Sequence, residues 1–207
     1  MKNIEKYYTI SDFNVTTLKE KGSIFTAHAY PIENEADAVK ILEQAKKKFY
    51  DATHHCYAYK LMGDEIKYSD DGEPNGTAGV RILNAINHFS LQKILVIVIR
   101  YFGGTKLGVG PLGKAYYSSA LQTLKNSSII EKAGYKRILI TAGLDQINNI
   151  YHLIDQFKGR IIKSDYTNNI TVECMVSIAD TEKFINNISE ISKGKATIKE
   201  DGAIIFL

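Results

Sequence analysis

Hydrophobic and polar residues follow two different periods along the first fifty residues. Three segments near the start are rich in Tyr, Thr, Val, Ile and Phe, and Gly22 separates the last two. Short runs of these residue types favour strands, so we expect a strand meander. The three segments are 7–10, 13–18 and 22–30. From Glu35 to about Tyr50, apolar residues recur at helical spacing after the N-capping residue Asn34, which predicts a helix.

The middle of the chain alternates between strand-like and helix-like patterns. Ile94–Ile99 is an unbroken aliphatic run without polar alternation, so we expect a central strand that is covered on both faces. Thr77 could cap one helix, and Pro111 suits the first position of the next. The expected strands are 53–62 and a short run to Tyr68, and the expected helices run from Thr77 to about Phe89 and from Pro111 to about Lys125.

A change of pattern near Gly134 predicts a second domain. The expected elements are a strand at 135–142, a helix at 145–158, strands at 160–167 and 170–178, a helix at 181–193 and a final pair of short strands. This βαββαβ order is that of a ferredoxin-like domain. The predicted fold class is therefore α+β with two domains, a mixed α/β domain over residues 1–134 and a ferredoxin-like domain over residues 135–207.

Composition and charge narrow the functional classes. The 207 residues carry a net charge of +3, and residues 135–207 contribute none of it. Neither part has the strongly basic balance of a dedicated nucleic-acid domain, so charge permits an RNA partner without requiring one. The longest aliphatic run is far too short to cross a membrane. We therefore expect no membrane segment. Cys56 and Cys174 form no CxxC pair and no disulfide framework is visible, so we expect a cytoplasmic protein.

Two glycine-rich loops stand out, because residues 69–79 and 100–111 together hold seven of the fifteen glycines. Each leads into a predicted helix, where backbone N–H groups can approach an anion closely. The run Gly108–Gly113 matches the GxGxxG pattern, but a dinucleotide fingerprint places its first glycine at the end of a strand. Here residues 101–107 intervene, and the P-loop pattern is absent, so both nucleotide motifs are rejected.

The first loop carries three acids in four residues, Asp70, Asp71 and Glu73. Carboxylates at this density could hold Mg²⁺, which would bridge to a phosphate. In a second interpretation, the first two acids simply belong to a tight turn. Arg100 could then pair with one of the three acids and lock the two loops together.

The second loop supplies the opposite charge and a candidate surface for an anion or a partner. Arg100 at the exit of a buried strand is well placed to bind a phosphate or a carboxylate. Together with neighbouring residues outside this loop, the candidate residues for binding an anion or a partner are Arg100, Lys106, Lys114, Gly103, Gly104, Thr77 and Arg81.

A further candidate pocket involves His54, Cys56 and Tyr101. His54 and Cys56 share one face of a predicted strand, where they could act as base and nucleophile. A packed histidine and a buried cysteine are the favoured alternative. Tyr101 and Phe102 could stack on bases, but aromatic residues at a strand end more often close a core.

Taken together, three motifs resemble the IMPACT family and its bacterial YigZ-type branch. They are Ala52-Thr53-His54-His55-Cys56-Tyr57-Ala58-Tyr59, the first loop from Ser69 to Gly79, and Arg100-Tyr101-Phe102-Gly103-Gly104-Thr105-Lys106-Leu107-Gly108. The resemblance implies a first domain similar to domain 2 of ribosomal protein S5. It implies a second domain similar to the last domain of elongation factor G. The chain departs from the family pattern at Lys114, where arginine is usual, and at Arg81, where proline is usual.

The resemblance also implies a function, since eukaryotic relatives modulate translational control by competing for a regulator of the amino-acid starvation kinase. We therefore expect a non-catalytic protein that binds RNA, the ribosome or a translation-regulatory partner through the two loops. The alternative is a Mg²⁺-dependent enzyme that acts on a phosphorylated small molecule or a nucleotide at the same loops.

Overall fold

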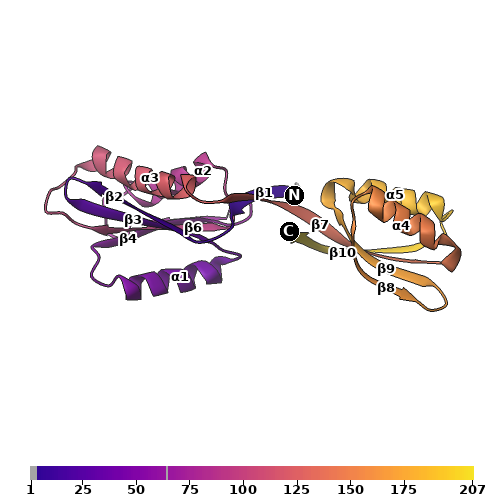
Figure 1. The fold of residues 1–207 in the computed structure, drawn as a ribbon. Coiled ribbons are helices and arrows are strands. Elements are labelled where there is room, and N and C mark those ends of the chain that lie inside the picture. Colours follow the sequence, from indigo (N-terminus) through magenta and orange to yellow (C-terminus); the bar gives the residue numbers. More distant parts are fainter. Residues whose placement is uncertain (1–3, 64) are drawn as a thin grey trace. The chain divides into compact units, whose positions relative to one another are not determined.

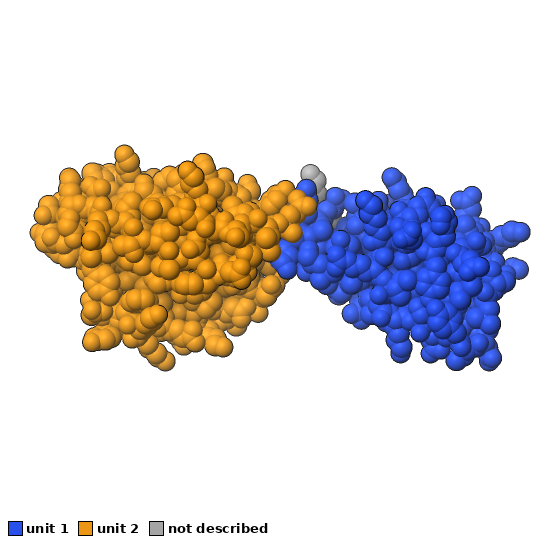
Figure 2. Space-filling view, in the orientation of Figure 1, with its two compact units in different colours: residues 1–7, 132–207 blue, residues 8–131 orange. Residues whose placement is uncertain are grey.

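The computed structural model of the chain describes residues 4–63 and 65–207. The chain divides into two compact units (Figure 2). Residues 8–131, coloured orange and labelled unit 2 in the figure, are called the first unit here. Residues 132–207 with the segment ending at Tyr7, coloured blue and labelled unit 1, are called the second unit. Each unit combines a β-sheet with helices, so the predicted two-domain α+β class is confirmed (Figure 1). No helix within the described ranges is long and apolar enough to cross a membrane.

The first unit is built on a five-stranded sheet in the order β2-β3-β6-β4-β5. Neighbouring strands in this sheet pair in antiparallel fashion. The strands are β2 Asn14–Glu20, β3 Ser23–Pro31, β4 His54–Lys60, β5 Ile66–Ser69 and β6 Ile94–Tyr101. As its apolar run predicts, β6 is the central strand, and its residues from Ile94 to Arg100 are buried.

Helices cover both faces of this sheet. α2 and α3 lie on one face and α1 on the other (Figure 1). The helices are α1 Glu35–Lys48, α2 Gly79–His88 and α3 Val109–Lys125. One core, with Phe25, Val98 and Tyr116, forms beneath α2 and α3. A second core, with Ile97 and Ile99, forms beneath α1.

The helix starts differ in how far they match expectation. Asn34 caps α1 as predicted, because its side chain accepts from Asp37 N at 3.0 Å. Thr77 does not cap α2, whose N-cap residue is Ala78. Instead, the Thr77 hydroxyl donates to Pro74 O at 2.6 Å and closes the preceding turn. α3 begins at Val109, two residues before Pro111, because Gly108 takes the capping position with φ +82°.

The second unit has the expected order of strand, helix, two strands, helix and strand. Its elements are β7 Ile129–Ala142, α4 Ile147–Gln156, β8 Arg160–Tyr166, β9 Ile170–Ser177, α5 Thr181–Ile191 and β10 Thr197–Phe206, with short 3₁₀ turns at Leu144–Gln146 and Ile178–Asp180. β7 pairs with both β9 and β10, and β8 pairs with β9. Its core packs between this sheet and the two helices.

Two expectations about strands are corrected. The first strand, β1 Lys6–Ile10, does not join β2 and β3 in a meander but lies beside β7. This pairing groups the segment ending at Tyr7 with residues 132–207, whereas the expected ranges were 1–134 and 135–207. The C-terminal residues form one strand, β10, with a register shift between Glu200 and Ile204 instead of two short strands.

Candidate binding site

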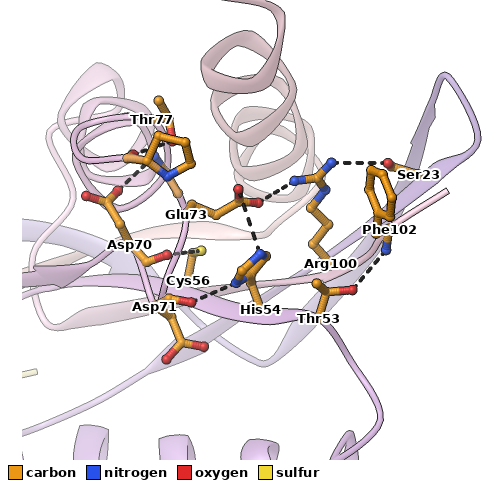
Figure 3. Close-up of polar contacts among 12 residues, drawn as sticks. Ser23, Thr53, His54, Cys56, Asp70, Asp71, Glu73, Thr77, Arg100 and Phe102 are labelled. Atoms are coloured by element: carbon orange, nitrogen blue, oxygen red, sulfur yellow. Dashed lines mark hydrogen bonds and ion pairs between the residues drawn. The ribbon is translucent and has the colours of Figure 1, made fainter. Parts of the chain in front are cut away.

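A buried ion pair joins the two glycine-rich loops. Arg100 stands near the end of β6, and Glu73 lies in the loop between β5 and α2. Arg100 Nη1 donates to Glu73 Oε1 at 2.6 Å, and the two side chains are only 6% and 4% exposed (Figure 3). Of the two interpretations of the charged loops, the structure supports the lock between them.

The guanidinium of Arg100 uses only some of its hydrogen-bond donors. Its Nη2 donates to the Ser23 hydroxyl at the long distance of 3.3 Å. Its Nε is buried and has no hydrogen-bond partner among the described residues. The Phe25 ring and the Phe102 ring lie 5.3 and 5.5 Å from Cζ, which places the cation against two aromatic side chains.

Glu73 is held by further side chains. Tyr116 on α3 donates its hydroxyl to Glu73 Oε1 at 2.7 Å. His54 Nδ1 lies 2.7 Å from Asp71 O, and a carbonyl only accepts, so Nδ1 carries the proton. His54 Nε2 then faces Glu73 Oε2 at 3.8 Å. His54, Glu73 and Arg100 therefore form one connected polar cluster (Figure 3).

Asp70 acts as the cap of α2 from outside the helix. Its carboxylate accepts from three backbone N–H groups, those of Gly76, Ala78 and Gly79, at 2.8–2.9 Å. These donors lie at or just before the start of α2, where N–H groups lack intrahelical acceptors. The negative charge also complements the helix dipole. The backbone N–H groups from Gly76 to Gly79, which could have bound an external anion, thus bind the carboxylate of Asp70.

Asp71 ties the same loop to β4. Its Oδ2 accepts from His55 N at 2.7 Å, and Lys46 Nζ lies 3.2 Å from Oδ1. Although burial opposes the charged form, the hydrogen bond from His55 N and the charge of Lys46 outweigh it and lower the pKa of Asp71. The three acids therefore bind three different sets of protein donors. They do not fit Mg²⁺, and no group of metal-ligating side chains gathers within residues 4–63 and 65–207.

The proposed pocket of His54, Cys56 and Tyr101 is not formed. Cys56 faces the core beneath α2 and α3, where its Sγ lies 3.0 Å from Asp70 O and 3.3 Å from the Tyr116 hydroxyl. Burial raises the pKa of the Cys56 thiol far above its usual range, so the thiolate needed for a nucleophile is disfavoured. Tyr101 packs on the opposite face, beneath α1, because side chains alternate along β6.

Gly103 is needed for packing. A β-carbon at Gly103 would lie 1.9 Å from the carbonyl carbon of Gly22 in the β2–β3 turn. Gly103 N also donates to the Ser23 hydroxyl at 3.2 Å, beside Arg100. Gly104, with φ +83°, has open space around it and forms the exposed bend of the loop.

A cavity of about 340 Å³ opens beside the Arg100–Glu73 pair. Most of its lining is apolar, and Lys106 at its edge is the exposed cation. The lining residues are Glu73, Pro74, Arg100, Phe102, Lys106, Leu107, Gly108, Val109 and Leu112. Phe102 is 46% and Val109 67% exposed, although both are large and apolar. The α3 start at Gly108 has no side-chain cap.

Lys114, Arg81 and Thr77, which were also predicted to bind an anion, do not line this cavity. Lys114 lines a second cavity of about 360 Å³ with Lys21 and Pro111. Arg81 Nε donates to Gly76 O at 3.2 Å on the exposed side of α2. Thr77 is buried and therefore closed to an anion. Of the seven predicted anion-binding residues, the structure brings Arg100 and Lys106 to one cavity.

Several residues of this site were not predicted as site residues. They are Ser23, Pro74, Leu107, Val109, Leu112 and Tyr116. The aromatic pair Tyr101-Phe102 was a usable signal, and the structure places Phe102, but not Tyr101, in the cavity lining. For Ser23 there was no such signal, because its contact with Arg100 spans 77 residues of sequence.

Comparisons with known proteins match this architecture. The Impact N-terminal domain matches residues 21–124, which include both loops and the cavity. The IMPACT family member YvyE of Bacillus subtilis is 30% identical over 206 residues, which cover 99% of this chain and 94% of YvyE. The IMPACT family member YigZ of Escherichia coli is 31% identical over 186 residues, which cover 87% of this chain and 91% of YigZ.

Solved structures show the same fold. The crystal structure of a hypothetical protein, 27% identical, matches with a TM-score of 0.66 over 94% of this chain and 97% of the other. A crystal structure from Thermus thermophilus that is 8% identical matches with a TM-score of 0.51 and covers 99% of this chain but 30% of the other, a likeness of fold alone. The family model matches half of this chain, and the two bacterial relatives align with most of it. This chain therefore belongs to the IMPACT family.

Proposed function

We propose that this protein is a non-catalytic, cytoplasmic RNA-binding protein that acts on the ribosome or on translation through the second glycine-rich loop and the start of α3. The observation that carries the proposal is the asymmetry of the two loops. The acids of the first loop are bound by protein donors, whereas the second loop presents Lys106, Phe102 and an uncapped helix start at one cavity.

The surface suits a polyanion more than a single ion. Lys106 lies before the first turn of α3, and Lys114 follows within the next turns beside Lys21. Cations spaced along a helix start can contact successive phosphates, and the helix dipole adds to their attraction. Exposed Phe102 offers a stacking surface, which RNA-binding proteins use for unpaired bases.

The resemblance to eukaryotic IMPACT proteins supports the link to translation. One such relative, the IMPACT homolog of Dictyostelium discoideum, is 38% identical over 98 residues, which cover 44% of this chain and 28% of that protein. The alternative of a Mg²⁺-dependent enzyme has less support, because Asp70, Asp71 and Glu73 each bind protein donors.

The test is direct binding to single-stranded RNA. The purified chain is titrated into a short fluorescein-labelled RNA at low ionic strength, and fluorescence anisotropy is followed as salt is added. We expect binding that weakens steeply with salt, since phosphate contacts release counterions. Absence of binding at low ionic strength would contradict the proposal and favour a protein partner at this surface.

A further inference from the structure

We infer that the cavity between the two loops holds one unstacked base of a single-stranded RNA, with its phosphate at the start of α3. The inference rests on the proposed RNA-binding function and specifies which part of the RNA enters the cavity. Three features of the cavity support it: its walls, its floor and its rim.

The walls of the cavity are mostly apolar. Pro74 comes from the first loop, Phe102 and Leu107 from the second, and Leu112 from α3. Phe102 is 46% exposed, so its ring is accessible although it also packs against the Arg100 guanidinium. Stacking on an aromatic ring beside an arginine is a common way to bind a base.

The floor carries hydrogen-bonding groups of both kinds. Arg100 supplies donors, and Glu73 supplies a carboxylate beside them. Arg100 is more than nine-tenths buried, and its Nε lacks a partner in the described part of the chain. A buried guanidinium with an unused donor is costly, and this residue is part of the cavity lining. The edge of a base presents donors and acceptors side by side, as this floor requires.

The rim is where the phosphate belongs. Gly108 precedes α3 and provides no side-chain cap, so the N–H groups of Val109 and Gly110 have no side-chain acceptor. Lys106 is exposed two residues earlier at the edge of the same cavity. A helix start together with a lysine favours a phosphate. The buried Arg100 is the independent feature that ties this helix start to a ligand.

The experiment compares two ligands of equal charge, one with bases and one without. Fluorescein-labelled single-stranded RNA and an abasic ribose-phosphate chain of the same length are titrated with the wild type, Phe102→Ala and Phe102→Tyr. Phe13→Ala is the matched control, because Phe13 is also about half exposed, at 49%. Circular dichroism and urea unfolding establish that each variant is folded.

We expect the wild type to bind RNA about 5- to 150-fold more tightly than the abasic chain, the range typical of one stacked base. Phe102→Ala should remove most of this preference, whereas Phe102→Tyr and Phe13→Ala should keep it. Equal affinity of the wild type for both chains would overturn the base pocket and leave RNA binding intact. So would an equal loss of both affinities in Phe102→Ala. Binding of neither chain would overturn the proposed function itself.

Discussion

The guanidinium of Arg100 and the carboxylate of Glu73 form a buried ion pair, with 2.6 Å between Nη1 and Oε1. The pair joins the end of β6 to the loop that precedes α2, across 27 residues of sequence. The pair therefore helps to fix the position of the two loops relative to each other. The cavity that we propose as a binding site has this pair as its floor.

Replacing Arg100 should destabilise the protein as well as alter the cavity. In Arg100→Met, Glu73 would keep its contact with Tyr116 but lose its buried cation, and such losses typically cost about 3–5 kcal/mol. The measurement is the free energy of unfolding in urea. In the double variant Arg100→Met/Glu73→Gln no charge is left uncompensated, so we expect a clearly smaller loss than for Arg100→Met alone. If the double variant is the less stable of the two, the ion-pair account is wrong.

Gly103 and Gly110 should respond oppositely to the same substitution. A methyl group at Gly103 would overlap the backbone of Gly22, which has no flexible side chain to move, so we expect Gly103→Ala to lose about 3 kcal/mol. Gly110 has open space and lies in α3, so Gly110→Ala should gain up to about 1 kcal/mol. Thermal unfolding of the two variants checks this contrast. Equal effects would mean that the contact between the two turns is not needed.

His28 should make the first unit sensitive to acid. Burial, together with the charge of Lys48, lowers the pKa of His28 from 6.5 to about 4. The ring packs against Phe13, Tyr30 and Phe49, and Nε2 has no hydrogen-bond partner in the described ranges. Because the unfolded chain takes up the proton first, stability should be full above pH 6.5 and fall as pH drops toward 4.

The measurement is urea unfolding at several pH values across this window. His28→Gln should flatten the pH dependence, because the substituted side chain does not titrate. His88→Gln, at an exposed position on α2, should retain the wild-type slope. An unchanged slope in His28→Gln would show that other groups cause the acid sensitivity.

Much of the fold was predictable because its signals are local. The unbroken apolar run of β6 indicated a central strand, and Asn34 indicated the start of α1. The partner of β1 was not predictable in this way. A short run of strand-forming residues shows that a strand forms, but not that it lies beside β7, more than a hundred residues away.

The site was less predictable for the same physical reason. The sequence places three acids together, but their roles depend on what the fold brings near each one. Asp70 caps a helix that begins at Gly79, Asp71 binds the backbone of β4, and Glu73 binds Arg100. Likewise, the need for glycine at position 103 arises from Gly22, which local sequence does not reveal.

The central claim is that the second loop binds RNA phosphates, and the salt dependence of binding tests it most directly. For single strands, the slope of log affinity against log salt is about −0.7 per phosphate contact. We predict that Lys106→Gln makes this slope shallower by about 0.7 on the same reasoning. Lys40→Gln, an exposed position on α1, should leave it unchanged. If wild type and Lys106→Gln give the same slope, the second loop is not the RNA-binding surface.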